Sequence, residues 1–112
     1  DIKVAYDLNA IKNSLTNLFN TLPGERLLLP DYGADLRQYV FEPITELRAR
    51  SIAREIQTSI SKWEPRVKIT GLDVIGIEET NEYDITITLA VPFLRESLNI
   101  RSLINRSGFT II

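Results

Sequence analysis

The chain has 112 residues, a net charge of −2 and neither cysteine nor histidine. The two absences exclude a disulfide framework, a zinc finger, a thiol nucleophile and a Ser-His-Asp triad, and the charge lacks the basic excess typical of nucleic-acid-binding proteins. At this length we expect a single globular domain over residues 1–112. The net charge indicates no nucleic-acid partner, and apolar runs of only a few residues indicate no membrane partner.

The N-terminal part is predicted to form a short strand and then a helix. Apolar residues alternate with others over residues 2–6, which indicates the strand, and Asp7 or Asn9 is expected to cap the helix. Apolar residues then recur at steps of three and four over residues 8–22, and Pro23-Gly24 is expected to end the helix. No signal-peptide core is present in the first residues, so we expect a cytoplasmic or intracellularly assembled chain.

A second, short helix is predicted after a turn. The run Leu27-Leu28-Leu29 stops at Pro30, and the next residues have turn chemistry. Asp35 and Gln38 have the spacing of a capping box, so they would open a helix that Pro43 closes. In the plainer interpretation of this stretch, as a turn and a cap, the two aromatic residues Tyr32 and Phe41 lie in the core.

The third predicted helix begins after Thr45, its expected N-cap, and ends at Trp63 because Pro65 disfavours helical geometry at Glu64. An ion pair between Glu46 and Arg50 is expected from their spacing. The apolar stripe of this helix consists of Leu47, Ile52, Ile56, Ile60 and Trp63. A basic face formed by Arg48, Arg50 and Arg54 either is solvated or meets an acidic partner.

The rest of the chain is predicted to be strands. Alternation over residues 67–77 is interrupted at Gly71, where we expect a bulge, and the cleanest alternation covers residues 83–91 and ends at Pro92. The spacing of Leu98, Ile100, Leu103 and Ile104 fits a short helix or strand pieces, and residues 109–112 form a final strand. The predicted fold is therefore α+β, with about three N-terminal helices packed on a C-terminal antiparallel sheet.

No catalytic centre can be assigned. Glycoside hydrolysis needs two carboxylates at a fixed separation, and nothing in the sequence pairs the candidates. These are Glu25, Asp31, Asp35, Glu42 and Glu64. We therefore assign no catalytic residue, no metal ligand and no cofactor site.

The segment Trp63-Glu64-Pro65-Arg66 has two interpretations. In the first, Arg66 compensates the helix C-terminus and Glu64 is solvated. In the second, proline fixes Glu64 and Arg66 on a rigid corner as a preorganised charged clasp for another chain.

Several of these segments resemble one family when they are taken in order. They are residues 21–26 with Pro30, Tyr32 and Gly33, then Phe41-Glu42, then residues 63–67. The pattern, from about Ile11 to about Leu89, is similar to the gene-product-25-like baseplate wedge proteins of contractile phage tails, which are often labelled "lysozyme-like" and have a relative in the type VI secretion baseplate. The resemblance implies a non-enzymatic structural subunit of the virion tail baseplate, assembled in the host cytoplasm.

The resemblance also implies partners. Members of the family lie around the tail tube, bridge the helical core bundle of the wedge to the first sheath ring, and initiate sheath assembly by strand exchange. Carried onto this chain, Glu64, Pro65 and Arg66 become the contact to the bundle. We extend the expected partner-binding site to Trp63, Glu25 and Arg26.

The final strand is a candidate for exchange. Phe109, Ile111 and Ile112 are apolar, and a free apolar edge strand invites pairing with another chain. Residues 2–6 are a second candidate, and either segment could instead pair within the domain's own sheet. Two other functions remain open at this point. They are a muralytic glycosidase, as the family label suggests, and a bacterial anti-adaptor that shields a sigma factor from proteolysis.

Overall fold

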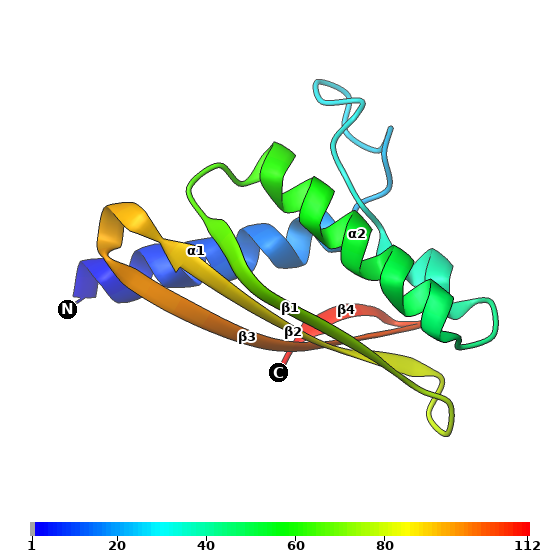
Figure 1. Cartoon of the computed structure of the whole chain (residues 1–112). Helices are drawn as coiled ribbons and strands as arrows, with labels where there is room; N and C mark the ends of the chain where they lie inside the picture. Colours follow the sequence, from blue (N-terminus) through cyan, green and yellow to red (C-terminus); the bar gives the residue numbers. More distant parts are fainter. Residues whose placement is uncertain (1) are drawn as a thin grey trace.

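The computed structural model describes residues 2–112 (Figure 1). Helix α1 (Ile2–Phe19), 3₁₀ helix η1 (Leu36–Val40) and helix α2 (Glu46–Trp63) precede the sheet. The strands are β1 (Lys68–Ile77), β2 (Glu82–Val91), β3 (Glu96–Asn105) and β4 (Gly108–Ile111), and 3₁₀ helix η2 (Pro92–Leu94) connects β2 to β3. The four strands are antiparallel neighbours in chain order, so the predicted α+β class with N-terminal helices and a C-terminal antiparallel sheet is confirmed.

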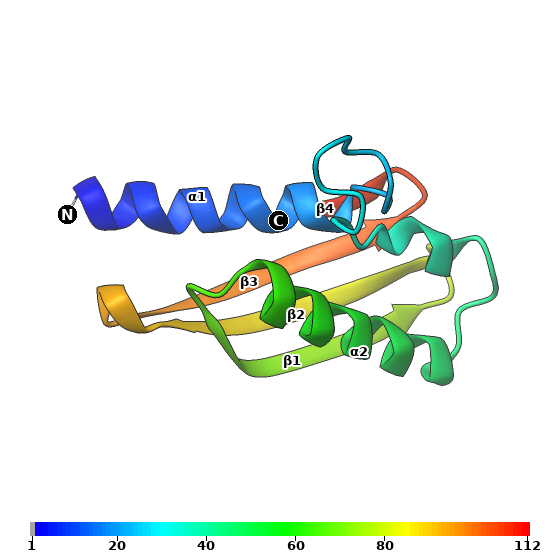
Figure 2. The same cartoon turned by 90° about the horizontal axis from the view of Figure 1, so that it is seen from above.

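The core lies between the two long helices and one face of the sheet. Seen from above, α2 lies over the β1 side and α1 runs along the β4 side (Figure 2). On β2 the residues that face the helices are buried and those between them are partly exposed, which is the alternation of a sheet with one covered face. The buried set includes Ile11, Leu15, Phe19, Ile52, Ile56, Ile60, Tyr83, Ile85, Ile87 and Leu89. No helix within residues 2–112 is long and apolar enough to cross a membrane.

The predicted strand at residues 2–6 is wrong, because these residues form the first turns of α1. Alternation of two apolar residues is too short to distinguish a strand from the exposed start of a helix. Ile2 and Tyr6 are 92% and 71% exposed, so neither marks a buried face. The helix also runs straight through Asp7 and Asn9, which therefore do not cap it.

Helix α1 ends earlier than predicted, at Phe19 rather than near Leu22. The side chains of Asn20 and Thr21 donate to the carbonyls of Thr16 (2.8 Å) and Asn17 (2.5 Å), so polar side chains replace the next helical turn. Gly24 does adopt the left-handed conformation, with φ +95°, but it lies in the following loop.

Helix α2 matches its prediction at both ends. Thr45 Oγ1 accepts a hydrogen bond from the N–H of Arg48 (3.0 Å), which confirms the N-cap, and the last helical residue is Trp63. Leu47 is wrongly placed in the stripe, since it is 72% exposed. Five residues separate it from Ile52, about 140° away around a helix, and Ala49 takes the buried position instead.

The sheet resolves the ambiguous tail. The register of β1 shifts between Ile69 and Gly71, which confirms the bulge. β3 is one continuous strand whose core-facing positions include Ser102, which is fully buried and donates to the carbonyl of Ile85 (3.1 Å). β4 pairs with β3, so the final strand belongs to the domain's own sheet.

Candidate functional site

The junction between α2 and β1 is a rigid corner. The N–H of Glu64 donates to the carbonyl of Ile60 (2.9 Å), and the next residue, Pro65, cannot continue the helix. A turn bond from the N–H of Val67 to the carbonyl of Glu64 (3.4 Å) then leads the chain into β1 at Lys68. The angle between α2 and β1 is therefore set by the few residues that connect them.

Glu64 is the buried centre of this corner. It is only 3% exposed, and its carboxylate accepts hydrogen bonds from Arg66 Nε (2.5 Å), Arg66 Nη2 (2.9 Å) and Ser14 Oγ (2.9 Å). The interpretation that Glu64 is solvated is therefore wrong. Its side chain ties the corner to the middle of α1, while the Arg66 side chain remains 42% exposed.

Both members of this pair are charged at neutral pH. Burial raises the pKa of Glu64, but the hydrogen bonds from Arg66 and Ser14 together outweigh burial and leave that pKa below its ordinary value. The hydrogen bonds to Glu64 raise the pKa of Arg66. The corner therefore presents a fixed guanidinium at the surface.

An aromatic and cationic stack connects the corner to the loop before η1. The Trp63 and Tyr32 rings meet edge to face, with centroids 5.2 Å apart, and the Arg26 guanidinium lies 4.6 Å from the Tyr32 centroid. Burial raises the pKa of the Tyr32 hydroxyl, the charge of Arg26 lowers it and that of Glu64 raises it. Tyr32 is buried as expected, and it brings the predicted residues Arg26, Trp63 and Glu64 together.

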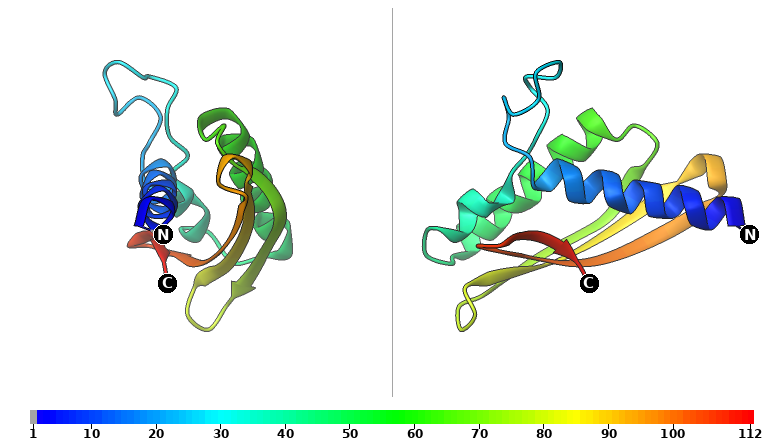
Figure 3. Two further views of the ribbon diagram at one scale, coloured as in Figure 1. Left: turned by 90° about the vertical axis from the view of Figure 1, so that its left-hand side faces the viewer. Right: turned by 180° about the vertical axis from the view of Figure 1, so that it is seen from behind.

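The loop of residues 22–31 projects from the body of the domain (Figures 1 and 3). Glu25 stabilises its start by accepting from the N–H of Leu22 (3.1 Å). Leu27 and Leu28, next to Arg26, are 94% and 89% exposed. We call Arg26, Leu27, Leu28, Pro65 and Arg66 the corner surface.

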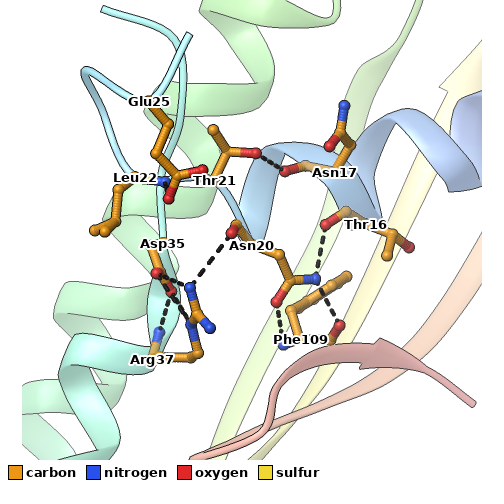
Figure 4. A network of polar contacts seen from close by, with 9 residues as sticks. All are labelled: Thr16, Asn17, Asn20, Thr21, Leu22, Glu25, Asp35, Arg37 and Phe109. Atoms are coloured by element: carbon orange, nitrogen blue, oxygen red, sulfur yellow. Dashed lines mark hydrogen bonds and ion pairs between the residues drawn. The ribbon is translucent and has the colours of Figure 1, made fainter.

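A second polar junction lies at the end of α1 (Figure 4). Asp35 is 6% exposed, accepts from the N–H of Arg37 (2.9 Å) and forms a fork with the Arg37 guanidinium, whose Nη2 also approaches the carbonyl of Asn20 (3.5 Å). Asp35 thus caps η1, but no bond to Gln38 completes the expected capping box within residues 2–112. Phe41, which the plainer interpretation placed in the core, lies at the end of η1 and is 64% exposed.

Asn20 also closes one edge of the sheet. Its amide nitrogen donates to the carbonyl of Phe109 (2.9 Å), and its amide oxygen accepts from the N–H of the same residue (2.8 Å) (Figure 4). Phe109 itself is 2% exposed and packs on Phe19 with centroids 5.0 Å apart. Of the other predicted β4 residues, Ile111 is partly buried and Ile112 is 69% exposed.

We expect Asn20→Ala to destabilise the domain by about 2 kcal/mol, because it removes three hydrogen bonds and leaves the main chain of Phe109 unpaired. Urea unfolding followed by circular dichroism measures the loss. Asn17→Ala is the matched control, since the Asn17 side chain is exposed. Equal stability of the two variants would show that Asn20 does not hold β4 in place.

The predicted partner-binding residues thus form two groups. Ser14, within α1, anchors the corner, and Asn20, just after the end of α1, anchors β4. The structure does not bring Phe109, Ile111 and Ile112 to the corner. The basic face of α2 is partly neutralised, because Arg48 pairs with Glu42 and Arg50 pairs with Glu46, the latter at 3.1 Å as expected.

Two linking residues were not singled out from the sequence, Ser14 and Asn20. Both lie in a helical pattern where polar residues are expected to face solvent, and their partners are 50 and 89 residues away. The sequence did contain one signal for the two buried acids, which is the spacing between each acid and the arginine that binds it. Asp35 with Arg37, and Glu64 with Arg66, both place an arginine two residues after a buried acid.

The described carboxylates are not arranged as a metal site. Within residues 2–112, no three Asp or Glu side chains are grouped closely enough to hold a metal ion. The two buried acids are each bound by their own arginine. Hydrogen bonds from the Arg37 side chain lower the pKa of Asp35, against an opposing effect of burial. A general acid in glycoside hydrolysis needs a raised pKa, so neither acid is suited to that role.

The sequence profile of the family described as "Baseplate wedge protein gp25" matches residues 5–93. Two similar proteins are baseplate wedge protein gp25 of Enterobacteria phage T4, 31% identical over 83% of this chain and 67% of its own length, and baseplate protein W of Escherichia phage P2, 30% identical over 59% of this chain and 57% of its own length. The chain therefore spans less than two thirds of the P2 protein.

Two solved structures have the same fold. A chain of the postcontracted baseplate of pyocin R2 is 25% identical, with a TM-score of 0.64 over 74% of this chain and 83% of its own. A Geobacter sulfurreducens protein, provisionally named a tail lysozyme, is 24% identical, with a TM-score of 0.74 over 85% of this chain and 86% of its own. At that identity the second likeness concerns the fold alone.

Proposed function

Because the chain belongs to the gp25 family of baseplate wedge proteins, we propose that it links the helical core bundle of a tail wedge to the tail tube and the first sheath ring, and that sheath assembly starts on it. The family profile and the two similar phage proteins confirm the family that the sequence motifs indicated. They also confirm the expected location in the tail baseplate of the virion. The similar proteins are baseplate components, which favours this role over a regulatory anti-adaptor.

The observation that carries the proposal is the geometry of the corner. A buried Glu64 holds Arg66 in a bidentate fork, and Pro65 fixes the chain between them. A guanidinium held in this way loses little freedom on binding, so it suits recognition of a carboxylate or helix C-terminus on a partner. Glu64 acts through Arg66 and does not itself reach the partner.

The exposed leucines of the corner surface support its role in binding a partner. Leu27 and Leu28 lie next to Arg26, which is stacked on Tyr32 at the corner. Adjacent apolar and cationic side chains on a projecting loop are typical of a protein–protein contact. We propose that the leucines enter an apolar groove between helices of the core bundle while Arg66 binds at its rim.

We propose a non-enzymatic role. The buried acids Asp35 and Glu64 each have a lowered pKa and a bound arginine, which favours structural over acid–base use. Peptidoglycan turnover by the purified chain above the buffer rate would contradict this.

Wedge reconstitution tests the corner. We expect Glu64→Ala with Arg66→Ala to abolish assembly of wedges at concentrations where the wild type assembles completely, as judged by native electrophoresis and electron microscopy. Removing both members leaves no unpaired charge, which limits the loss of stability. Asp35→Ala with Arg37→Ala is the matched control, because it removes the same kind of fork elsewhere. Normal assembly by the Glu64→Ala, Arg66→Ala variant would rule out the corner as the contact to the core bundle.

A second arm of the same experiment avoids the buried pair. Leu27→Ser with Leu28→Ser leaves the core untouched, since both side chains are almost fully exposed. Leu47→Ser, at a leucine that is 72% exposed on α2, is its control. The proposal requires that only the loop variant loses assembly.

A further inference from the structure

Three segments that are far apart in the sequence meet at one end of the domain and leave apolar side chains exposed there. They are the loop after α1, the end of η1 and the turn between β3 and β4 (Figure 2). Leu22 in the loop is 51% exposed, and Phe41 at the end of η1 is 64% exposed. Both line a hollow of about 330 Å³, together with Gln38 and with Arg106 from the turn. We call these four residues the η1 surface.

Hydrogen bonds hold the two apolar residues of the η1 surface in place. The side-chain amide of Asn81 donates to the carbonyl of Val40 (3.1 Å), which fixes the main chain directly before Phe41. The N–H of Leu22 donates to the carboxylate of Glu25 (3.1 Å). Neither Leu22 nor Phe41 packs against the hydrophobic core. Their backbone is therefore ordered before any partner arrives, so little conformational entropy is lost when they are covered.

The cation of the η1 surface is carried on a well-defined turn. The side-chain oxygen of Asn105 accepts a hydrogen bond from the N–H of Ser107 (2.8 Å), and Arg106 lies between these two residues. The Arg106 guanidinium is 6.0 Å from the centroid of the Phe41 ring, at the outer limit of a cation–π contact. The positive charge thus stands directly beside the apolar side chain.

The charge of Arg106 is the one that the hollow leaves unbalanced. The other two charged residues that line it, Asp35 and Arg37, form an ion pair with each other. Within residues 2–112, no carboxylate pairs with Arg106. A carboxylate on another chain would supply the missing partner in a charge-assisted hydrogen bond. The hollow is therefore complementary to an apolar group that has a negative charge next to it.

We infer that the η1 surface binds an acidic protein segment through side chains, with an apolar side chain of the segment against Leu22 and Phe41 and a neighbouring carboxylate on Arg106. A nucleic acid fits this surface less well, because the chain has a net charge of −2 and offers a single unpaired arginine here. The inference goes beyond the proposed function. The η1 surface shares no residue with the corner surface, so it stands whether or not the corner contacts the core bundle.

A peptide titration of the wild-type chain tests the inference without any substitution. The probe is the hexapeptide Asp-Glu-Leu-Phe-Asp-Glu, blocked at both ends and added to the isotope-labelled chain while its amide resonances are followed by NMR. The amides of Leu22, Gln38, Phe41 and Arg106 should shift and saturate with a Kd below about 1 mM, and that of Arg66 at the corner should not shift. Absence of saturable shifts, or shifts confined to other parts of the chain, would overturn the inference.

Two further peptides separate the apolar part of the contact from the charged part. The peptide Asp-Glu-Ser-Ser-Asp-Glu keeps the charges, and Asn-Gln-Leu-Phe-Asn-Gln keeps the apolar side chains. We expect the first to bind at least about fivefold more weakly than the original peptide and the second at least about threefold more weakly. If either control peptide binds as tightly as the original, recognition does not need both features, and the inference is overturned.

Matched substitutions identify the residues that bind. Phe41→Ser and Arg106→Gln change exposed side chains, and we expect each to weaken binding of the original peptide at least about threefold. Their controls are Phe93→Ser, at an aromatic residue that is 56% exposed on η2, and Arg54→Gln, at an exposed arginine of α2, which should each change binding less than about 1.5-fold. Equal effects of variants and controls would overturn the inference. Circular dichroism verifies folding, and the titrations of the wild-type chain remain decisive if a variant does not fold.

Discussion

Gly33→Ala is expected to destabilise the domain by about 4 kcal/mol, a large part of the stability of a small domain. Gly33 has φ +127°, a region that side chains with a Cβ rarely enter. The loop here returns against the end of α1, where the N–H of Ala34 donates to the carbonyl of Leu18 (3.0 Å). A Cβ at Gly33 would overlap the carbonyl oxygen of Thr21 and lie 2.9 Å from its carbonyl carbon.

Gly24→Ala separates backbone strain from this overlap. Gly24 also has a positive φ, +95°, but an added Cβ would meet no atom within 4 Å. We therefore expect a loss of only about 1 kcal/mol. Urea unfolding of both variants provides the comparison, and similar losses would mean that the close approach of Gly33 to Thr21 contributes nothing.

Glu64→Ala is expected to lower the free energy of unfolding by about 3 kcal/mol, because it leaves Ser14 and Arg66 without their buried acceptor. This loss of stability is at the lower end of the range for breaking a buried ion pair, because Arg66 is 42% exposed and becomes hydrated when Glu64 is removed. Glu46→Ala, which breaks an exposed pair, should change stability by less than about 0.5 kcal/mol.

The same residue predicts a dependence on pH. The pKa of Glu64 is lower in the folded chain than its ordinary value of 4.5, so its stabilising effect is complete above that value. The effect is lost as pH falls through the folded pKa, and Asp35 acts in the same direction. Unfolding free energies at pH 7 and pH 3 should therefore differ more for the wild type than for Glu64→Gln. Equal differences would contradict a charged Glu64 in the folded chain.

The regular elements could be predicted where one physical pattern dominates. β2 alternates without exception and lies in the centre of the sheet, so its sequence pattern and its burial pattern coincide. Thr45 and Pro65 mark the two ends of α2 through local geometry, which needs no tertiary information.

Predictions failed where tertiary contacts decide the outcome. Ser102 occupies a buried position of β3, where its hydroxyl donates to the carbonyl of Ile85. Because a polar residue stands at this core-facing position, the sequence of β3 does not alternate clearly between apolar and polar residues. The first turns of α1 are helical although the apolar residues Ile2 and Tyr6 there are exposed. At the candidate site, the sequence correctly placed residues 63–66 at a junction between a helix and a strand. It did not indicate the burial of Glu64, since the partner Ser14 lies on a distant helix.

The connections of Asn20 have a consequence for the order of folding. The strands form consecutive hairpins, whose closure involves short loops, whereas Asn20 and Phe109 are 89 positions apart. Contacts that close a long loop carry a larger entropic penalty and form late unless the intervening chain is already compact. The four-stranded meander should therefore form first, and α1 should dock last, when its end meets β4. By the same reasoning, α1 is the element whose detachment exposes the core while the meander remains paired.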